Sequence, residues 1–104
     1  MENKVQEILI YKLKENTGHE FHKIMTEESA PLHKRKGLKI IYCGKSLHDV
    51  DSYCLIREFD SLEQLERSQE KFYSDDDWIN GPREKIVSLM VSSNRFISKK
   101  GFMS

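Results

Sequence analysis

Arg57 is the polar residue whose position says most about possible chemistry. It lies in a predicted β-strand in which its neighbours Leu55, Ile56 and Phe59 are apolar. A guanidinium held inside such a strand needs an anionic partner, because a buried charge without one is very costly. That partner is either a ligand carboxylate or enolate, bound through two parallel hydrogen bonds, or a carboxylate of the protein in a structural ion pair. The sequence leaves both interpretations open.

His33 is the second residue that can do chemistry. Pro31 removes one amide donor from the helix predicted around it, so we expect a kink or break near Ser29. Beyond that break, a neutral His33 imidazole can face a pocket and act as a general base near pH 7. The alternative is a surface histidine among basic neighbours. If His33 is a base, Arg57 would stabilise a developing oxyanion, and these two are the candidate catalytic residues.

Several aromatic residues are candidates for lining an apolar cavity between a helix and the sheet. Phe72 and Trp78 flank an acidic stretch at the end of a predicted helix, and a hydrophobic ligand would need such walls. With Tyr11 and Tyr42 of the predicted strands, and with Arg57, they form the candidate ligand-binding set. Ordinary core packing is the alternative explanation for the same aromatic residues.

Other kinds of site have little support. His19 and His22 lie three residues apart and can face one ion, but no third ligand is placed, so we expect no metal site. The chain contains no glycine-rich nucleotide-binding motif, no Gly-x-Ser-x-Gly and no His-Glu-x-x-His, and we expect no cofactor. Cys43 and Cys54 are expected to be reduced, small core residues.

The elements that must position these residues follow from hydrophobic periodicity. It predicts strands over residues 5–13, 38–44, 52–59 and 91–97, helices over 17–36 and 62–73, and a short helix after Gly81-Pro82. Thr17-Gly18-His19-Glu20 and Ser61-Leu62-Glu63-Gln64 have the form of capping boxes. The order β-α-β-β-α-(α)-β predicts an α+β, ferredoxin-like fold, with a four-stranded antiparallel sheet and helices on one face.

The predicted sheet is apolar on both faces. In the first strand Leu9 and Tyr11 alternate with Ile8 and Ile10, and the third strand alternates in the same way. The helices of so short a chain cover only one face, and large exposed apolar patches are rare on soluble monomers. We therefore expect a homodimer in which two sheets pack face to face around a twofold axis.

Length and charge narrow the class of protein. A chain of 104 residues fits one domain, here residues 1–104, with Ser98 to Ser104 expected to form a flexible tail. The 17 basic and 17 acidic residues balance, so the long-range field expected of a nucleic-acid or acidic-membrane binder is absent. Neither a signal h-region nor a membrane span is apparent, and we expect a cytoplasmic protein.

Short segments in a fixed order also carry a resemblance. They are Glu28-Ser29-Ala30-Pro31-Leu32, Tyr42-Cys43-Gly44, the stretch from Asp51 to Phe59, Ser61-Leu62-Glu63, Phe72-Tyr73 ahead of Trp78, and Gly81-Pro82-Arg83-Glu84. Across nearly the whole chain this pattern resembles a bacterial NIPSNAP-type domain. The resemblance implies the dimeric α/β barrel superfamily, in which two ferredoxin-like protomers join their sheets. That superfamily includes cofactor-free antibiotic biosynthesis monooxygenases, haem enzymes and ligand binders.

Two functional hypotheses follow, and a shared fold does not choose between them. The first is a homodimeric NIPSNAP-like protein that binds a small, partly apolar molecule in a cavity between sheet and helices. The second is a cofactor-free monooxygenase or isomerase with His33 as base and Arg57 as oxyanion stabiliser. Whether the chain is an enzyme stays open at this point. The favoured hypothesis is the first, because no paired acid and base can be placed from the sequence.

Overall fold

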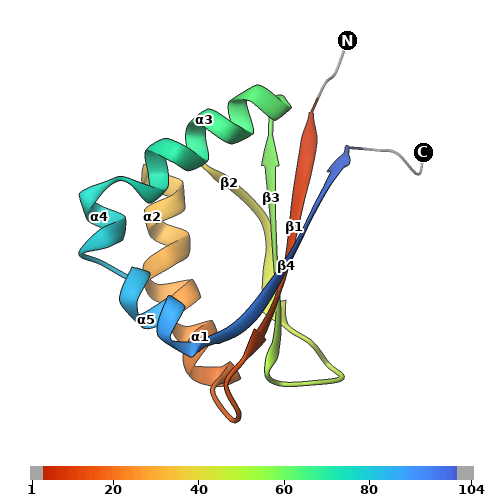
Figure 1. The fold of residues 1–104 in the computed structure, drawn as a ribbon, viewed down its shortest axis with the longest axis vertical. Coiled ribbons are helices and arrows are strands. Elements are labelled where there is room, and N and C mark those ends of the chain that lie inside the picture. Colours follow the sequence, from red (N-terminus) through yellow and green to blue (C-terminus); the bar gives the residue numbers. More distant parts are fainter. Residues whose placement is uncertain (1–3, 101–104) are drawn as a thin grey trace.

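The structure is a computed structural model that describes residues 4–100. Its elements in chain order are β1 (Val5–Leu13), α1 (Gly18–Ile24), η1 (Met25–Ser29), α2 (Ala30–Arg35), β2 (Lys39–Lys45), β3 (Ser52–Phe59), α3 (Leu62–Tyr73), α4 (Asp76–Ile79), α5 (Arg83–Leu89) and β4 (Met90–Lys99). The sheet order is β2-β3-β1-β4, with every neighbouring pair antiparallel. All helices lie on one side of the sheet (Figure 1). This confirms the predicted α+β, ferredoxin-like fold.

The predicted strand bounds are confirmed for β1 and β3, and β2 begins one residue later than predicted. The last strand is longer than predicted. Ser98 and Lys99, assigned to a tail from the sequence, belong to β4 and pair with Gln6 and Val5. The tail prediction is wrong for these two residues, because β1 starts early enough to offer them partners. Lys100 follows the strand, and its amide donates to the Lys4 carbonyl at 3.0 Å. The remaining residues of that predicted tail, 101–104, lie outside the described residues.

The expected break near Ser29 takes the form of a π-helical turn. Over η1 the backbone bonds span five residues, and the amide of Ala30 donates to the carbonyl of Met25. Pro31, which has no amide proton, follows directly as one of the first residues of α2. A π turn holds one more residue than an α turn. The extra residue changes which side chains of the following helix face the sheet, and the helix continues past the proline. The face toward the sheet carries His33.

The first predicted capping box is wrong. The Thr17 hydroxyl donates to the Lys14 carbonyl at 2.6 Å and does not cap the helix. The backbone amides from Asn16 to Gly18 instead donate to the carboxylate of Asp51, at 2.9 to 3.1 Å. Asp51 comes from the β2–β3 connection, so a distant part of the chain satisfies the amides that a local motif would otherwise satisfy.

The second capping box is confirmed at its main bond. The amide of Gln64 donates to the Ser61 hydroxyl at 3.1 Å. In the reciprocal bond, the amide of Asp60, one residue before the cap, donates to Gln64 Oε1 at 3.0 Å. The two bonds fix the start of α3, whose buried face carries Leu65 and Phe72.

The hydrophobic core lies between the sheet and the helical layer. The buried strand residues alternate along β1 and β3, as predicted. They are Leu9, Tyr11, Leu13, Tyr53, Leu55 and Phe59, and the helices add Phe21, Ile24, Met25, Leu32, Leu65, Phe72, Trp78 and Ile86.

No helix formed by residues 4–100 packs against the other face of the sheet. One cross-strand row runs through all four strands in the order Tyr42, Ile56, Ile8, Phe96. In this row Tyr42 is 49% and Phe96 is 63% exposed. The next row contains Cys54 and the exposed Ile10. The sheet is therefore apolar on both faces, as the alternation predicted, and we call the uncovered side the open face.

Candidate functional site

The centre of the helix-covered face holds an ion pair. Arg57 and Glu7 are directly opposite each other on β3 and β1, and each is 1% exposed. Arg57 Nε donates to Glu7 Oε1 at 2.8 Å, and the second guanidinium nitrogen Nη2 lies 2.6 Å from the same oxygen. Of the two interpretations left open by the sequence, the structure shows the protein's own carboxylate as the partner of Arg57.

Glu7 has further partners on its second oxygen. Gln69 Nε2 donates to Glu7 Oε2 at 2.8 Å, and Arg95 Nε donates to the same oxygen at 2.5 Å. Arg95 Nη2 also donates to the amide oxygen of Gln69. Burial alone would raise the pKa of the Glu7 carboxyl. The charge of Arg57 and the bonds from Gln69, Arg95 and Arg57 outweigh burial and lower that pKa. Two guanidinium groups therefore share one carboxylate, which leaves one net positive charge in this cluster.

His33 lies in the same cluster and is 2% exposed. The alternative interpretation, a surface histidine, is therefore wrong; the turn before Pro31 directs this side chain inward. His33 Nδ1 donates to the Ser29 carbonyl at 2.7 Å, and Nε2 lies 3.0 Å from Arg57 Nη1. Because a guanidinium only donates, Nε2 must accept, and the imidazole is neutral.

Electrostatics agree with a neutral imidazole. Burial, and then the nearby charge of Arg57, lower the pKa of His33 to about 4. The Phe72 ring covers the imidazole, with centroids 4.4 Å apart. The structure thus brings the two candidate catalytic residues, His33 and Arg57, into direct contact. Their facing polar atoms are already bonded to one another.

Tyr73 connects this cluster to the surface. Its hydroxyl accepts a hydrogen bond from Arg57 Nη1 at 2.8 Å, and the Arg57 guanidinium carbon lies 5.7 Å from the centre of the Tyr73 ring. Sequence reasoning did not include Glu7 or Gln69 among the site residues. The signal for Glu7 was present, since it lies on the same face of β1 as Leu9 and a buried carboxylate requires a cation.

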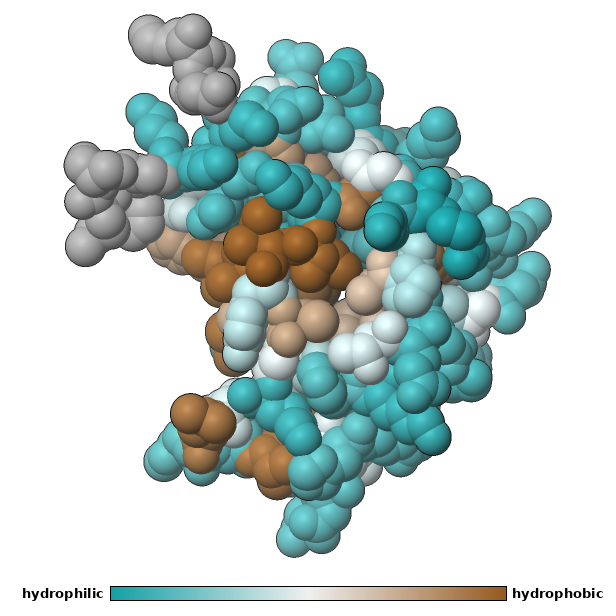
Figure 2. Space-filling view, turned by 180° about the vertical axis from the view of Figure 1, so that it is seen from behind, coloured by the Kyte–Doolittle hydropathy of each residue, from teal (hydrophilic) through white to brown (hydrophobic). Residues whose placement is uncertain are grey.

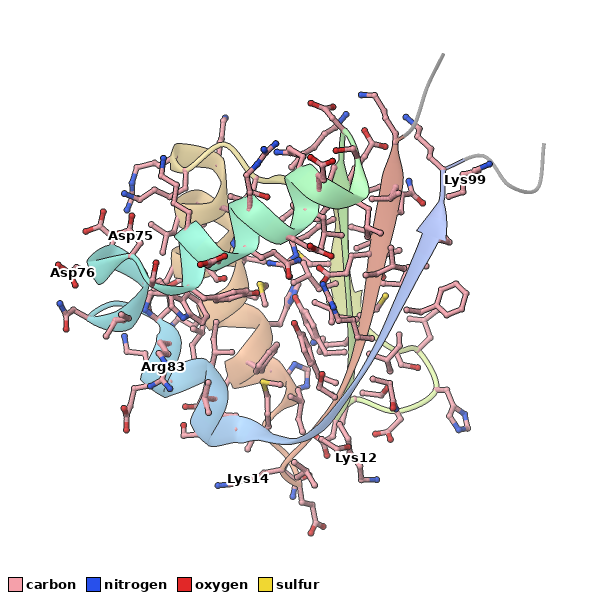
Figure 3. All side chains as sticks on the ribbon, turned by 45° about the horizontal axis from the view of Figure 1, so that its top comes forward. Lys12, Lys14, Asp75, Asp76, Arg83 and Lys99 are labelled. Atoms are coloured by element: carbon pink, nitrogen blue, oxygen red, sulfur yellow. The ribbon has the colours of Figure 1, made fainter. Side chains whose placement is uncertain are left out.

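A cavity of about 430 Å³ lies beside Tyr73, between β1 and the last helices. Its lining residues are Tyr11, Tyr73, Trp78, Arg83, Ile86, Val87 and Met90. Arg83 stands at the start of α5, where that helix follows α4 (Figure 3). The cavity has mainly aromatic and aliphatic walls with a few polar groups, which is the usual make-up of a small-molecule site.

The Tyr11 hydroxyl is the unpaired polar group of this cavity. Tyr11 is 8% exposed, and its hydroxyl has no hydrogen-bond partner among residues 4–100. In that part of the chain no fully buried side-chain polar atom lacks a partner. The Tyr11 hydroxyl must therefore reach open space, and the cavity that Tyr11 lines provides it.

The structure separates the predicted ligand-binding residues into two groups. Tyr11 and Trp78 line the 430 Å³ cavity. Phe72 packs behind Trp78 with ring centroids 5.4 Å apart, and Arg57 touches the cavity wall only through a phenol. Tyr42 lies on the open face, in a separate hollow of about 270 Å³. The structure does not bring Tyr42 together with the others.

The remaining polar candidates have separate partners. His22 Nδ1 lies 2.6 Å from the Tyr53 hydroxyl, and His19 Nδ1 lies 2.7 Å from Lys45 Nζ. No group of three potential metal ligands occurs within residues 4–100. Cys43 and Cys54 are free thiols in β2 and β3, and Cys54 pairs in register with a glycine.

The surface seen from behind in Figure 2 carries a central patch of apolar side chains next to a hollow, with polar side chains around it.

A further pocket of about 410 Å³ lies between α2 and β2, lined by Ala30, Lys34, Leu38, Lys39 and Ile40. Across residues 4–100, the helices are too short or too polar to traverse a lipid bilayer.

Comparison with known proteins places this architecture. No protein-family model and no curated protein matches the sequence. A NIPSNAP family protein from Agrobacterium tumefaciens has a similar structure, with a TM-score of 0.89, 17% identity, and coverage of 100% of this chain and 91% of that chain. An uncharacterised NIPSNAP-like domain protein from Burkholderia xenovorans matches with a TM-score of 0.88, 18% identity, and coverage of 100% and 90%.

A more distant likeness is to SnoaB, a cofactor-independent oxygenase from Streptomyces nogalater. Its TM-score is 0.69 at 11% identity, and the match covers 95% of this chain and 94% of that chain. The chain thus has the fold of solved NIPSNAP family proteins, with a weaker likeness to antibiotic biosynthesis monooxygenases. The resemblance found in the sequence is confirmed at the level of the fold.

Proposed function

We propose that this chain is a homodimeric NIPSNAP-like protein that binds a small, partly apolar molecule in the cavity beside Tyr11 and Trp78. The observation that carries the proposal is the Tyr11 hydroxyl, which opens into a mostly apolar cavity and has no hydrogen-bond partner among the described residues 4–100. The hydroxyl of a buried tyrosine normally forms a hydrogen bond with another protein group. Where a ring only fills the core, phenylalanine would serve equally well. A ligand oxygen would supply the missing partner.

The proposal of a homodimer rests on the open face. Its central row is apolar and consists of Tyr42, Ile56, Ile8 and Phe96. The row at one end pairs Glu58 with Gln6 and a lysine, and the row at the other end pairs Lys12 with two serines. An apolar centre with a polar rim is the anatomy of a protein interface, and a second copy offers a matching surface through twofold symmetry.

Light scattering on Phe96→Asp tests the dimer. The unmodified protein should have twice the mass of one chain at micromolar concentration, and the variant should have the mass of one chain. Phe96 is 63% exposed within one protomer, so the substitution spares the fold. Leu62→Asp is the matched control, because Leu62 is 52% exposed at the start of α3, away from the open face. A single-chain mass for the unmodified protein would contradict the dimer.

Trp78 offers a direct test of the ligand site, because it is the only tryptophan of the chain and it lines the cavity. Its indole N–H gives one resonance in a ¹H–¹⁵N spectrum. The neutral probe 3-phenylpropanamide should shift that resonance in a saturable way. Val87→Phe, which fills the cavity, should abolish the shift, whereas Leu62→Phe should leave it unchanged. A probe that binds equally well to Val87→Phe would place its site elsewhere.

The second candidate is a cofactor-free monooxygenase or isomerase that uses His33 as base and Arg57 as oxyanion stabiliser. It draws on the contact between these residues and on the fold likeness to a cofactor-independent oxygenase. It receives less support than ligand binding for two reasons. The His33 lone pair faces Arg57, and neither residue lines the cavity in which a substrate would lie. Catalysis by this pair would require His33 to turn away from Arg57.

A further inference from the structure

Two phenol hydroxyls share the wall of the cavity. Tyr11 comes from β1 and Tyr73 from the last turn of α3. The Tyr73 oxygen accepts from Arg57, and since a phenol has a single donor, its proton remains available. Within residues 4–100, neither hydroxyl proton has an acceptor in the protein. The cavity therefore presents two hydrogen-bond donors from opposite sides, one from the sheet and one from the helical layer.

Positive charge lies directly behind Tyr73. Arg57 and Arg95 share the single carboxylate of Glu7, and His33 is neutral, so the cluster keeps one net positive charge. A hydroxyl that accepts a hydrogen bond from a cation becomes a stronger donor, because hydrogen bonds in a chain polarise one another. The Tyr73 proton is therefore the preferred position for an anionic acceptor.

The Tyr11 phenol is a protonated donor near neutral pH. Burial raises the pKa of the Tyr11 hydroxyl, and the neighbouring Tyr73 hydroxyl raises it further. Arg83, an exposed guanidinium at the cavity wall, has no carboxylate partner within residues 4–100 and adds positive potential. A ligand amine would meet donors and like charge at every polar position of this cavity.

We infer that the ligand is a small carboxylic acid with an apolar or aromatic body, bound as its carboxylate by the Tyr11 and Tyr73 hydroxyls. Its apolar part would pack against Trp78, Ile86 and Met90. This inference rests on the proposed function and adds the class of ligand. It also gives the buried cluster a role, because the charge of Arg57 reaches the ligand through the Tyr73 hydroxyl.

Two matched probes test the inference. The Trp78 indole resonance is followed during titration with 3-phenylpropanoate and with 3-phenylpropanamide, which differ only in the charged end. Hydrogen bonds to an ionised acceptor are about twice as strong as neutral ones, so the carboxylate should bind about tenfold more tightly. Tyr11→Phe and Tyr73→Phe should each reduce this preference to about threefold or less.

Tyr42→Phe is the control for these variants, because it removes the same atom on the open face and should retain the full preference. Equal affinity of the unmodified protein for both probes would overturn the inference and leave the proposed function standing. Binding of neither probe would overturn both. A carboxylate preference that survives in the Tyr11→Phe and Tyr73→Phe double variant would assign it to Arg83 alone and overturn the role of the phenols.

Discussion

The two faces of the sheet place their polar and apolar residues in opposite ways. The helix-covered face holds a buried charged cluster at its centre, in which Glu7, Arg57 and His33 satisfy one another. The open face holds a partly exposed apolar row at its centre, and the buried carboxylate of Glu58 lies beneath lysines at the end of the strands. The charged groups of the covered face have their partners within the chain, whereas no element among residues 4–100 covers the apolar row of the open face.

This difference assigns a separate role to each face: the covered face selects the strand register, and the open face favours association with another surface. A buried ion pair contributes little net stability, but a wrong strand register would leave both charges unpaired, so it selects one register. Exposed isoleucine and phenylalanine in a cross-strand row add nothing to the protomer that polar residues would not also provide. These side chains stabilise the protein only when another surface covers them and removes them from water. The following variants compare the two faces.

The largest expected effect comes from the carboxylates. Glu7→Gln leaves Arg57 buried without a counter-charge and should lower the free energy of unfolding by about 3 to 5 kcal/mol. Glu58→Gln should cost no more than about 1 kcal/mol, because its lysine partners reach solvent. Urea denaturation measures both. The Glu7→Gln, Arg57→Met double variant should regain much of the loss, and a double variant as unstable as Glu7→Gln would contradict the pairing.

Neighbouring residues on β3 give the next comparison. Leu55 is 2% exposed in the core, and Leu55→Ala should cost about 3 kcal/mol at every protein concentration. Ile56 points to the open face, and Ile56→Ala should cost less in dilute protein and progressively more as concentration rises, because association stabilises the dimer by mass action. Thermal unfolding at several concentrations measures this. A concentration-independent cost for Ile56→Ala would remove the energetic link between the open face and association.

The pH dependence of stability tests the covered face. The pKa of His33 is lowered from 6.5 to about 4 in the folded protein. Between these values the unfolded chain binds a proton that folded His33 does not bind, so stability falls as pH falls. From pH 6.5 to pH 5 the loss should be about 2 kcal/mol.

This pH range isolates the imidazole. The pKa of Glu58 is held near 2, chiefly by a hydrogen bond from Lys100, so its contribution is lost only below the ordinary carboxyl range. The His33→Gln variant should show a flatter profile than the unmodified protein in urea denaturation at each pH. His48→Gln, in the exposed hairpin connection, is the control. An unchanged slope for His33→Gln would mean that another group titrates.

The smallest effect concerns the end of the helical layer. Asp51→Ala removes the acceptor of the amides from Asn16 to Gly18 and should lower the melting temperature more than Thr17→Ala. Bonds from these amides lower the pKa of Asp51, beginning with the bond from Asn16. Stability should therefore fall as acid protonates this carboxyl. Equal melting temperatures for the two variants would contradict the role of Asp51 as the cap of this helix.

Much of the fold could be predicted because its signals are local. Period-two alternation predicted β1 and β3 with their bounds and faces, and Ser61 marked the start of α3. The first cap could not be predicted in this way. Thr17 has the right spacing to Glu20, but Asp51 lies close enough in space to take its place. A sequence motif cannot show that a remote carboxylate competes for the same amides.

The site was predictable only in part. Arg57 and the aromatic residues were recognised by type, but Tyr42 was grouped with them although it lies on the opposite face. The cause is the register shift in β2 between Ile40 and Tyr42, which changes the face that later side chains occupy. A local irregularity of this kind leaves no clear mark in residue composition.

The sequence by itself determined the order of elements, the apolar character of both sheet faces and the need of Arg57 for an anion. Only the tertiary structure decided that Glu7 is that anion, that His33 is buried against Arg57 and that Tyr11 shares a cavity with Trp78. The physical reason is that β1 and β3 pair across 50 residues of chain with no hairpin between them, so no short turn sets their register. Packing of the whole helical layer against the sheet sets it instead.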